Sequence, residues 1–179
     1  MFGLADNWKP NARLKRLAAR LDAVLAEDQR AEAEMAQLDQ TRRNGAEELH
    51  AICSRFAAEL NLLLKQGGVV LDPPEFTGDQ FRDAGVTLFQ LNARGRIVQI
   101  AFEIPPAPVS TETFREPYIL QGTVRSFNQE SLELHSVEEH ELFLCLRGAG
   151  SQWRYFDART YQTGTFTPQY LTALMERLI

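Results

Sequence analysis

The chain of 179 residues has little cysteine, little lysine and no long apolar run. Cys53 and Cys145 are its only cysteines, too few for a disulfide framework or for a zinc site made of four thiolates. The longest unbroken apolar stretches are a few residues, far short of the roughly 20 that a membrane-spanning helix needs. Residues 1–8 lack a basic start followed by an apolar core, so we expect no secretory signal and a cytoplasmic location.

The sequence also lacks an excess of positive charge and any familiar catalytic motif. Its formal net charge is -5, from 24 acidic and 19 basic residues. Because phosphate neutralisation needs clustered lysine and arginine, this balance argues against nucleic-acid binding. The chain contains no serine elbow, zinc-protease helix, phosphate loop or dinucleotide glycine fingerprint. We therefore expect no cofactor and no catalytic residues, and the sequence favours a protein that is not an enzyme.

The composition changes at the Gly67–Gly68 pair. Residues 1–66 contain 13 of the 20 alanines and 3 of the 17 aromatic residues, whereas residues 67–179 contain 14 aromatic residues and 7 of the 8 prolines. Sequence rich in alanine and poor in proline is typical of helix, and aromatic residues favour strands. We predict an α+β protein with a helical arm over residues 1–66 and a body over residues 67–179.

Apolar residues recur along the arm at heptad spacing, the pattern of helices that pair through one face. Asp28, Arg42 and Gly45 interrupt this repeat, because none of them suits an apolar core. Asn44–Gly45 can end one helix and begin another, since glycine readily adopts the left-handed conformation of a helix stop. One long helix and a helical hairpin are equal alternatives. The repeat consists of Leu14, Leu17, Leu21, Val24, Met35, Leu38, Leu49, Ile52, Phe56 and Leu63.

Charge changes sign along the arm. Residues 9–20 contain five cations and no carboxylate, whereas residues 21–40 contain six carboxylates and one arginine. Two antiparallel copies would set Arg20 of one chain opposite Glu34 of the other, whereas parallel copies would set carboxylates against carboxylates. We predict self-association or a partner protein bound through the first helix, antiparallel in a homodimer. In the alternative, residues 46–66 fold back on the first helix and the protein is a monomer.

A membrane-surface anchor at the start of the arm is a weaker hypothesis. Phe2, Leu4 and Trp8 precede the basic segment, and basic helices with aromatic residues lie in membrane interfaces. Two turns of such a helix bind weakly, so we expect no stable membrane attachment.

Alternating apolar residues in the body predict an antiparallel meander of about five to six strands. The first hairpin turns at Arg94–Gly95 and pairs Leu91 with Val98, which places one apolar face towards the core. Leu142–Leu146 is apolar on both faces, which predicts a central strand. The expected strands are Val86–Asn92, Ile97–Ile104, Ile119–Phe127, Ser131–Ser136, His140–Arg147 and Gln152–Asp157.

The chain after these strands predicts a terminal helix packed on the sheet. Thr167 is a suitable N-cap and Pro168 suits the first helical position. The segment Pro105–Pro117 is a long connection, either a plain crossover or a polyproline II element that docks on a partner.

Histidine and cysteine are the residues that would bind a metal or act as nucleophiles. If Leu134 pairs with Leu142, then His140 faces the core, whereas His135 and Cys145 lie on the opposite face and His135 pairs with Glu141. His50 and Cys53 are three residues apart on the arm and have no companions. We therefore predict no metal site and two buried, inert cysteines.

Two functions from different classes follow. The leading hypothesis is a non-enzymatic interaction, scaffold or adaptor protein that acts through the arm. Its interaction residues are Leu14, Leu17, Leu21, Val24, Met35, Leu38, Arg20 and Glu34. The alternative is a small-ligand-binding or enzymatic domain with a pocket between the sheet and the terminal helix, with Trp153, Arg154 and Tyr155 at its rim.

The absence of a metal site is directly testable. Treatment of the purified protein with EDTA should leave its circular dichroism spectrum and its denaturant midpoint unchanged. One equivalent of zinc in elemental analysis, lost together with the fold on chelation, would contradict this prediction.

Overall fold

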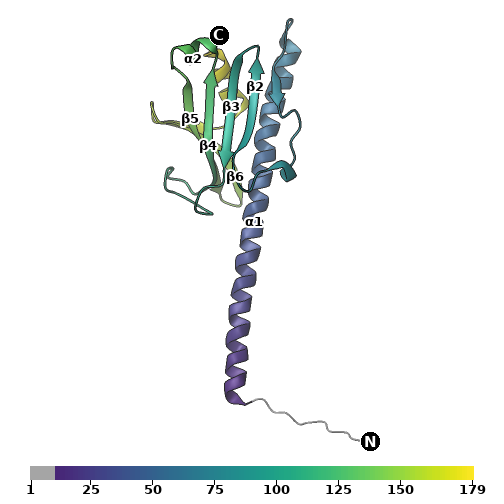
Figure 1. Cartoon of the computed structure of the whole chain (residues 1–179), viewed down its shortest axis with the longest axis vertical. Helices are drawn as coiled ribbons and strands as arrows, with labels where there is room; N and C mark the ends of the chain where they lie inside the picture. The colour runs from purple at the N-terminus through teal and green to yellow at the C-terminus, as the bar shows by residue number, and fades with distance from the viewer. Residues whose placement is uncertain (1–10) are drawn as a thin grey trace, which may run out of the picture. The chain divides into compact units, whose positions relative to one another are not determined.

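The chain forms a long helix, a seven-stranded sheet and a terminal helix, which confirms the predicted α+β class (Figure 1). The computed structural model describes residues 11–179, so Phe2, Leu4, Trp8 and the first cation of the arm lie outside the described residues. The helices are α1 (Ala12–Leu63), α2 (Gln129–Glu133) and α3 (Pro168–Glu176), with a 3₁₀ turn at Gly78–Gln80. The strands are β1 (Val70–Asp72), β2 (Thr87–Ala93), β3 (Arg96–Glu103), β4 (Tyr118–Phe127), β5 (Glu138–Arg147), β6 (Gly150–Asp157) and β7 (Gln162–Thr165).

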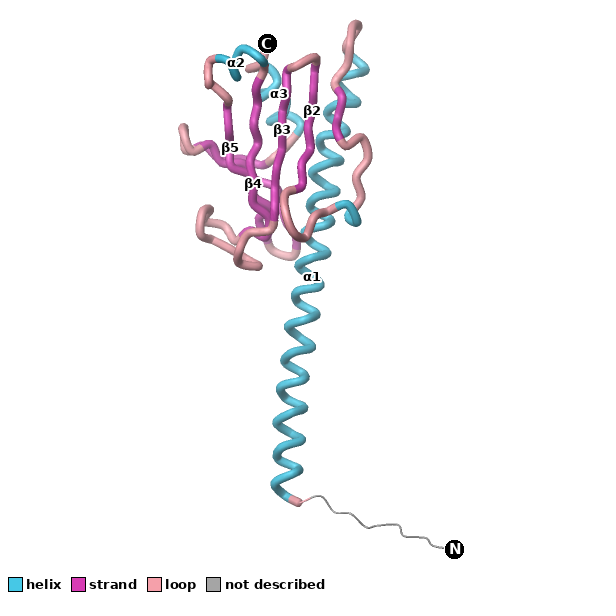
Figure 2. The backbone as a smooth tube through the Cα atoms, in the orientation of Figure 1, coloured by secondary structure: helices cyan, strands magenta, loops and turns pink. Residues whose placement is uncertain are grey.

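The seven strands form one antiparallel sheet in chain order, each hydrogen-bonded to the next (Figure 2). The predicted register of the first hairpin is confirmed, because Leu91 pairs with Val98 and Phe89 with Ile100. The predicted position of Leu142–Leu146 is also confirmed, since β5 lies between β4 and β6 and is buried on both faces. The sheet has seven strands, against the five to six predicted. β1 and β7, both short and at the edges, are the strands that were not expected.

The predicted strand at Ser131–Ser136 is wrong, because this segment is helix and turn. Asn128 caps α2 by accepting a hydrogen bond from the backbone N–H of Ser131 at 2.8 Å. Leu132 and Leu134 alternate with polar residues like a strand, yet both are exposed. Their spacing matched the strand period, but the cap four residues earlier decided the local structure.

One helix runs without interruption from Ala12 to Leu63, so the helical-hairpin alternative is wrong. The chain divides into two compact units, one that ends at Gln37 and one that comprises Leu38–Ile179. The second half of α1 therefore belongs to the unit that contains the sheet, which differs from the predicted division at residues 66 and 67.

Within Leu38–Ile179, α1 and α3 cover the same face of the sheet and share one apolar core with it. The terminal helix begins as predicted, with Thr167 as its cap and Pro168 at its first turn. Phe102 of β3 meets Trp153 of β6, with ring centroids 5.2 Å apart, although two strands separate them. The sheet must curl for these rings to meet, and its concave face encloses the core.

Gly45 lies where α1 approaches the sheet most closely. A Cβ atom at this position would overlap Cδ2 of Leu144, which is itself fully buried on β5. The backbone carbonyl of Gly45 accepts a hydrogen bond of 2.7 Å from Nε1 of Trp153. Glycine inside a helix costs about 1 kcal/mol relative to alanine. Close packing and a satisfied indole N–H offset that cost, which explains why the helix continues through this residue.

Arg42, about one turn before Gly45 on α1, is also buried, with 2% of its surface exposed. Its guanidinium donates to the carbonyls of Ile119 at 3.2 Å and Pro108 at 2.8 Å, and pairs with Asp39 at 2.6 Å. These bonds satisfy a buried charge that would otherwise be strongly unfavourable. Arg42 and Gly45, two of the three residues that interrupt the heptad pattern, therefore hold α1 against the body.

The close approach at Gly45 generates a prediction about its substitution by alanine. In the wild type, Gly45→Ala should lower the free energy of unfolding, because overpacking costs about 1 to 3 kcal/mol and helix propensity returns only about 1 kcal/mol. Leu144→Ala alone should cost about 2 to 5 kcal/mol through the cavity that it leaves. In the Leu144→Ala background, Gly45→Ala should instead be neutral or stabilising, because the obstructing side chain is gone.

Urea melts of the wild type, of Gly45→Ala, of Leu144→Ala and of the double variant measure these differences in the free energy of unfolding. Ser54→Ala, at an exposed position of the same helix, is the control for propensity alone and should change stability by less than about 0.5 kcal/mol. Equal stabilisation by Gly45→Ala in both backgrounds would show that α1 and β5 are not in contact there.

Candidate functional site

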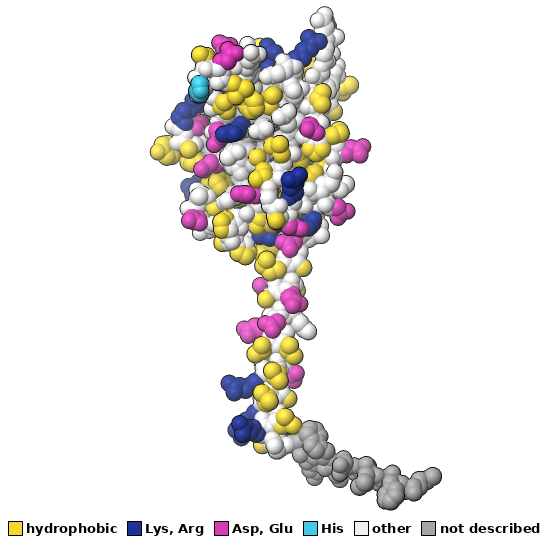
Figure 3. All heavy atoms as spheres, viewed as in Figure 1, with side chains coloured by type: hydrophobic (Ala, Val, Ile, Leu, Met, Phe, Trp, Pro, Cys, Tyr) yellow, Lys and Arg dark blue, Asp and Glu magenta, His cyan; other side chains and the backbone are white. Residues whose placement is uncertain are grey.

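The first part of α1 presents an apolar stripe to solvent. Every residue from Ala12 to Gln37 is exposed. The residues of the predicted interaction surface in this range include Leu14, Leu17, Leu21, Val24 and Met35, which are between 40% and 53% exposed. Figure 3 shows hydrophobic side chains along this part of the helix, with basic side chains gathered near its start and acidic ones further along. Arg20 and Glu34 are exposed among them.

Leu38 differs from the other residues of the predicted interaction surface. It is half-buried and packs against the core of the body, where α1 enters the second compact unit. The continuous helix also removes the predicted monomer in which residues 46–66 fold back on the first helix. We call the exposed residues Leu14, Leu17, Leu21, Val24 and Met35 the arm stripe.

The structure separates the three residues predicted at a pocket rim. Trp153 is buried in the core and bonded to Gly45, so it lies at no rim. Arg154 points to the opposite face of the sheet, because neighbouring residues of a strand alternate, and its Nε lies 3.6 Å from Glu116. Only Tyr155 lines a hollow of about 320 Å³ between β6, β7 and α3.

His140 of β5 is the polar centre of this hollow, and only 4% of its surface is exposed. Its Nδ1 lies 2.7 Å from the hydroxyl of Tyr170 on α3. Its Nε2 lies 3.1 Å from Glu138 and 3.7 Å from Asp157. Nδ1 and the phenol therefore share one hydrogen bond, and Nε2 faces the two carboxylates.

The environment sets the protonation of the groups around His140. Burial raises the pKa of Tyr170, so its phenol stays protonated at neutral pH. The hydroxyl of Thr160 holds the pKa of Asp157 below its ordinary value, so this carboxyl is ionised. Arg177 and Arg159 pair with Glu138 and balance its charge. The hydrogen bond with the protonated phenol of Tyr170 therefore orients His140, and a phenolate nucleophile is excluded at neutral pH.

The remaining histidines and cysteines are dispersed. His50 is buried and contacts the carbonyl of Pro73 at 2.8 Å, while His135 is exposed beyond α2 with a φ of 53°. Burial raises the pKa of Cys53 and of Cys145 to about 12, so neither is a thiolate near neutral pH. Residues 11–179 contain no group of three or more histidine, cysteine or acidic side chains that could hold a metal.

The predicted pairing of His135 with Glu141 is wrong, because the segment of His135 is not a strand. Glu141 instead lies between Thr123 of β4 and Phe156 of β6. His140 faces the core and Cys145 the other side of the sheet, as the alternation of β5 predicts. The arrangement inside β5 was thus correct, whereas its neighbour was misassigned.

Comparison with known proteins gives no match to a family model, a curated protein or a solved structure. Over the described part of the chain, no helix combines the length and the apolar character needed to cross a membrane.

The bond between Tyr170 and His140 predicts different effects for two neighbouring tyrosines. Tyr170→Phe should cost about 1 to 3 kcal/mol of stability, because it leaves Nδ1 of a buried imidazole without a partner. Tyr155→Phe is the matched control, since its ring stacks on Tyr170 with centroids 4.0 Å apart while its hydroxyl is not part of the His140 bond. It should change stability by less than about 0.5 kcal/mol in urea melts. Equal effects would show that the phenol does not support His140.

Proposed function

We propose that this chain is a non-enzymatic interaction protein that binds a second copy of itself through residues 12–37 of α1. The exposure of the arm stripe is the observation that carries the proposal. Helices in proteins draw most of their stability from packing of an apolar face, and isolated helices are marginal in water. An arm with every residue exposed therefore lacks its usual source of stability, and a second arm would supply it.

The arm stripe suits an antiparallel partner. Aligning Leu17 with Met35 and Leu21 with Ala31 gives apolar layers, and only the layer of Val24 with Asp28 is mixed. The outermost layer pairs Leu14 with the half-buried Leu38, at the border of the partner's body. Full burial of a leucine contributes about 1.5 to 3 kcal/mol, so these layers supply the affinity.

Charge selects the orientation. In the antiparallel alignment, Arg20 of each chain lies opposite Glu34 of the other, and the basic start of each arm follows the acidic stretch of its partner. Exposed ion pairs contribute only about 0 to 1 kcal/mol each. They favour the antiparallel arrangement over the parallel one, where carboxylates would face carboxylates along the same stretch.

The hollow beside His140 supports a second candidate, a domain that binds a small ligand between the sheet and α3. It ranks below the arm, because both ring nitrogens of His140 already lie within reach of Tyr170 and Glu138.

Sedimentation equilibrium of the full chain at micromolar concentration tests the proposal. The wild type should be a dimer, and Leu17→Glu should weaken association at least about tenfold, because it buries a charge in the stripe. Ala19→Glu, an exposed position of the same helix on the face away from the stripe, should leave association unchanged apart from a small charge effect. A monomeric wild type, or equal losses in both variants, would contradict the proposal.

A charge swap tests the orientation separately. Arg20→Glu and Glu34→Arg should each weaken the dimer several-fold at low salt, and the double variant should recover wild-type affinity, because the pair re-forms between chains with its charges exchanged. The two residues are 14 positions apart on one helix, about 21 Å, so they cannot pair within a chain. Additive losses in the double variant would rule out the antiparallel alignment.

A further inference from the structure

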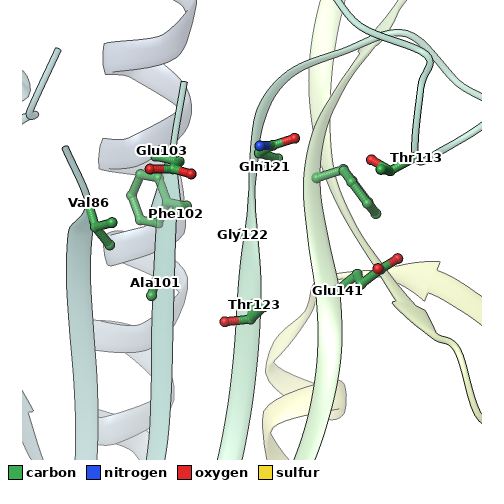
Figure 4. A pocket seen from close by; sticks show the side chains of 10 residues that line it. Val86, Ala101, Phe102, Glu103, Thr113, Gln121, Gly122, Thr123 and Glu141 are labelled. Carbon is green, nitrogen blue, oxygen red and sulfur yellow. The ribbon is translucent and has the colours of Figure 1, made fainter. Parts of the chain in front are cut away.

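A groove of about 370 Å³ lies on the face of the sheet opposite α1, between β3, β4, β5 and the segment that connects β3 to β4 (Figure 4). Ala101 and Thr123, both small, occupy the neighbouring central strands and leave this part of the face open. Next to it, Phe114 stacks on Phe143 with ring centroids 4.8 Å apart, as part of a second, smaller apolar cluster. Phe143 also contributes to the groove, so one wall is aromatic.

Two carboxylates flank this groove without a cation. Glu103 on β3 and Glu141 on β5 are half-buried, and neither has a hydrogen bond or an ion pair within residues 11–179. Figure 4 shows them at different ends of the groove, with the side chains of Gln121 and Thr123 between them. The groove therefore carries two negative charges and two neutral polar groups over an apolar floor.

Three arginines near this face pair with other carboxylates. Arg125 pairs with Glu139, and Arg147 and Arg154 lie at 2.8 Å and 3.6 Å from Glu116. The hydrogen bond from Arg147 keeps the pKa of Glu116 low, which shows how a paired carboxylate behaves on this face. Within residues 11–179, no cation forms an ion pair with Glu103 or Glu141.

The pKa of Glu141 is shifted in the opposite direction from that of Glu116. Burial, reinforced by the nearby charge of Glu139, raises its pKa above the ordinary value. An ionised carboxylate in such a place is unfavourable unless a positive group comes close. A bound cation would supply that group, whereas a bound anion would be repelled.

We propose that this groove binds a small organic cation, in which a planar amidinium or guanidinium group is carried on a flat apolar body. The cationic group pairs with Glu141, since planar N–H donors match a carboxylate in two parallel hydrogen bonds. The flat body lies over Ala101 against the edge of Phe143, and Glu103 adds attraction from the far end. The volume lies within the range of small-molecule sites, about 300 to 1,000 Å³.

Benzamidine and benzamide form a matched pair of probes, because they have nearly the same shape and differ in charge. Benzamidine should bind the full-length wild type, shifting the backbone amide signals of Gln121 and Thr123 in NMR titrations, and benzamide should bind at least about tenfold more weakly. Glu141→Gln should weaken benzamidine at least tenfold, and Glu103→Gln should weaken it several-fold. Glu176→Gln, an exposed carboxylate on α3, is the control and should bind like the wild type.

The pH dependence gives an independent readout. As pH falls through the raised pKa of Glu141, this carboxyl gains a proton and loses its charge, so the affinity for benzamidine should fall in the wild type. In Glu141→Gln the affinity should vary less with pH. Equal binding of the two probes, no binding of benzamidine, or unchanged affinity in Glu141→Gln would overturn the proposal. Circular dichroism of each variant checks that the fold is retained.

Discussion

The contact between Gly45 and Leu144 is the constraint on which the architecture of the body depends. Because Gly45 has no side chain, the backbone of α1 packs directly on the Leu144 side chain of β5, and the Gly45 carbonyl comes within reach of the indole of Trp153. Trp153 in turn meets Phe102 from three strands away, so the curl of the sheet and the position of the helix fix one another. Arg42 ties the same region of α1 to the segment around Pro108.

The heptad pattern of α1 runs through two environments, solvent up to Gln37 and the apolar core of the body after it. From Leu38 to Leu60 the apolar face of α1 packs on the core of the body, with Leu49 and Phe56 buried in it, whereas Leu63 at the end of the helix is exposed. From Ala12 to Gln37 the same periodicity continues, but every residue is exposed. Both halves of α1 have apolar residues at heptad spacing, but within the described residues only the second half packs this face against other elements. That difference supports an intermolecular role for the first half.

Local signals were sufficient to predict the first hairpin, the central strand and the capped terminal helix, because alternation and capping act over a few residues. They failed at Leu132 and Leu134, where strand-like alternation was overridden by the Asn128 cap. The roles of Arg42, Gly45 and Trp153 depend on partners 66 to 108 residues away, so nothing near them in sequence indicated burial. The prediction of the pocket rim is wrong for the same reason, and the unpaired state of Glu141 depends on Arg125, Arg147 and Arg154 pairing with other carboxylates.

The central claim is that the arm stripe becomes buried when two chains associate. Hydrogen exchange of backbone amides, measured over a range of protein concentrations, tests this claim most directly, because protection of a helix that pairs between chains depends on concentration. The account predicts that amides of residues 12–37 become more protected as concentration rises, while amides of β5 stay equally protected throughout. Exchange from residues 12–37 that is fast and independent of concentration would contradict it.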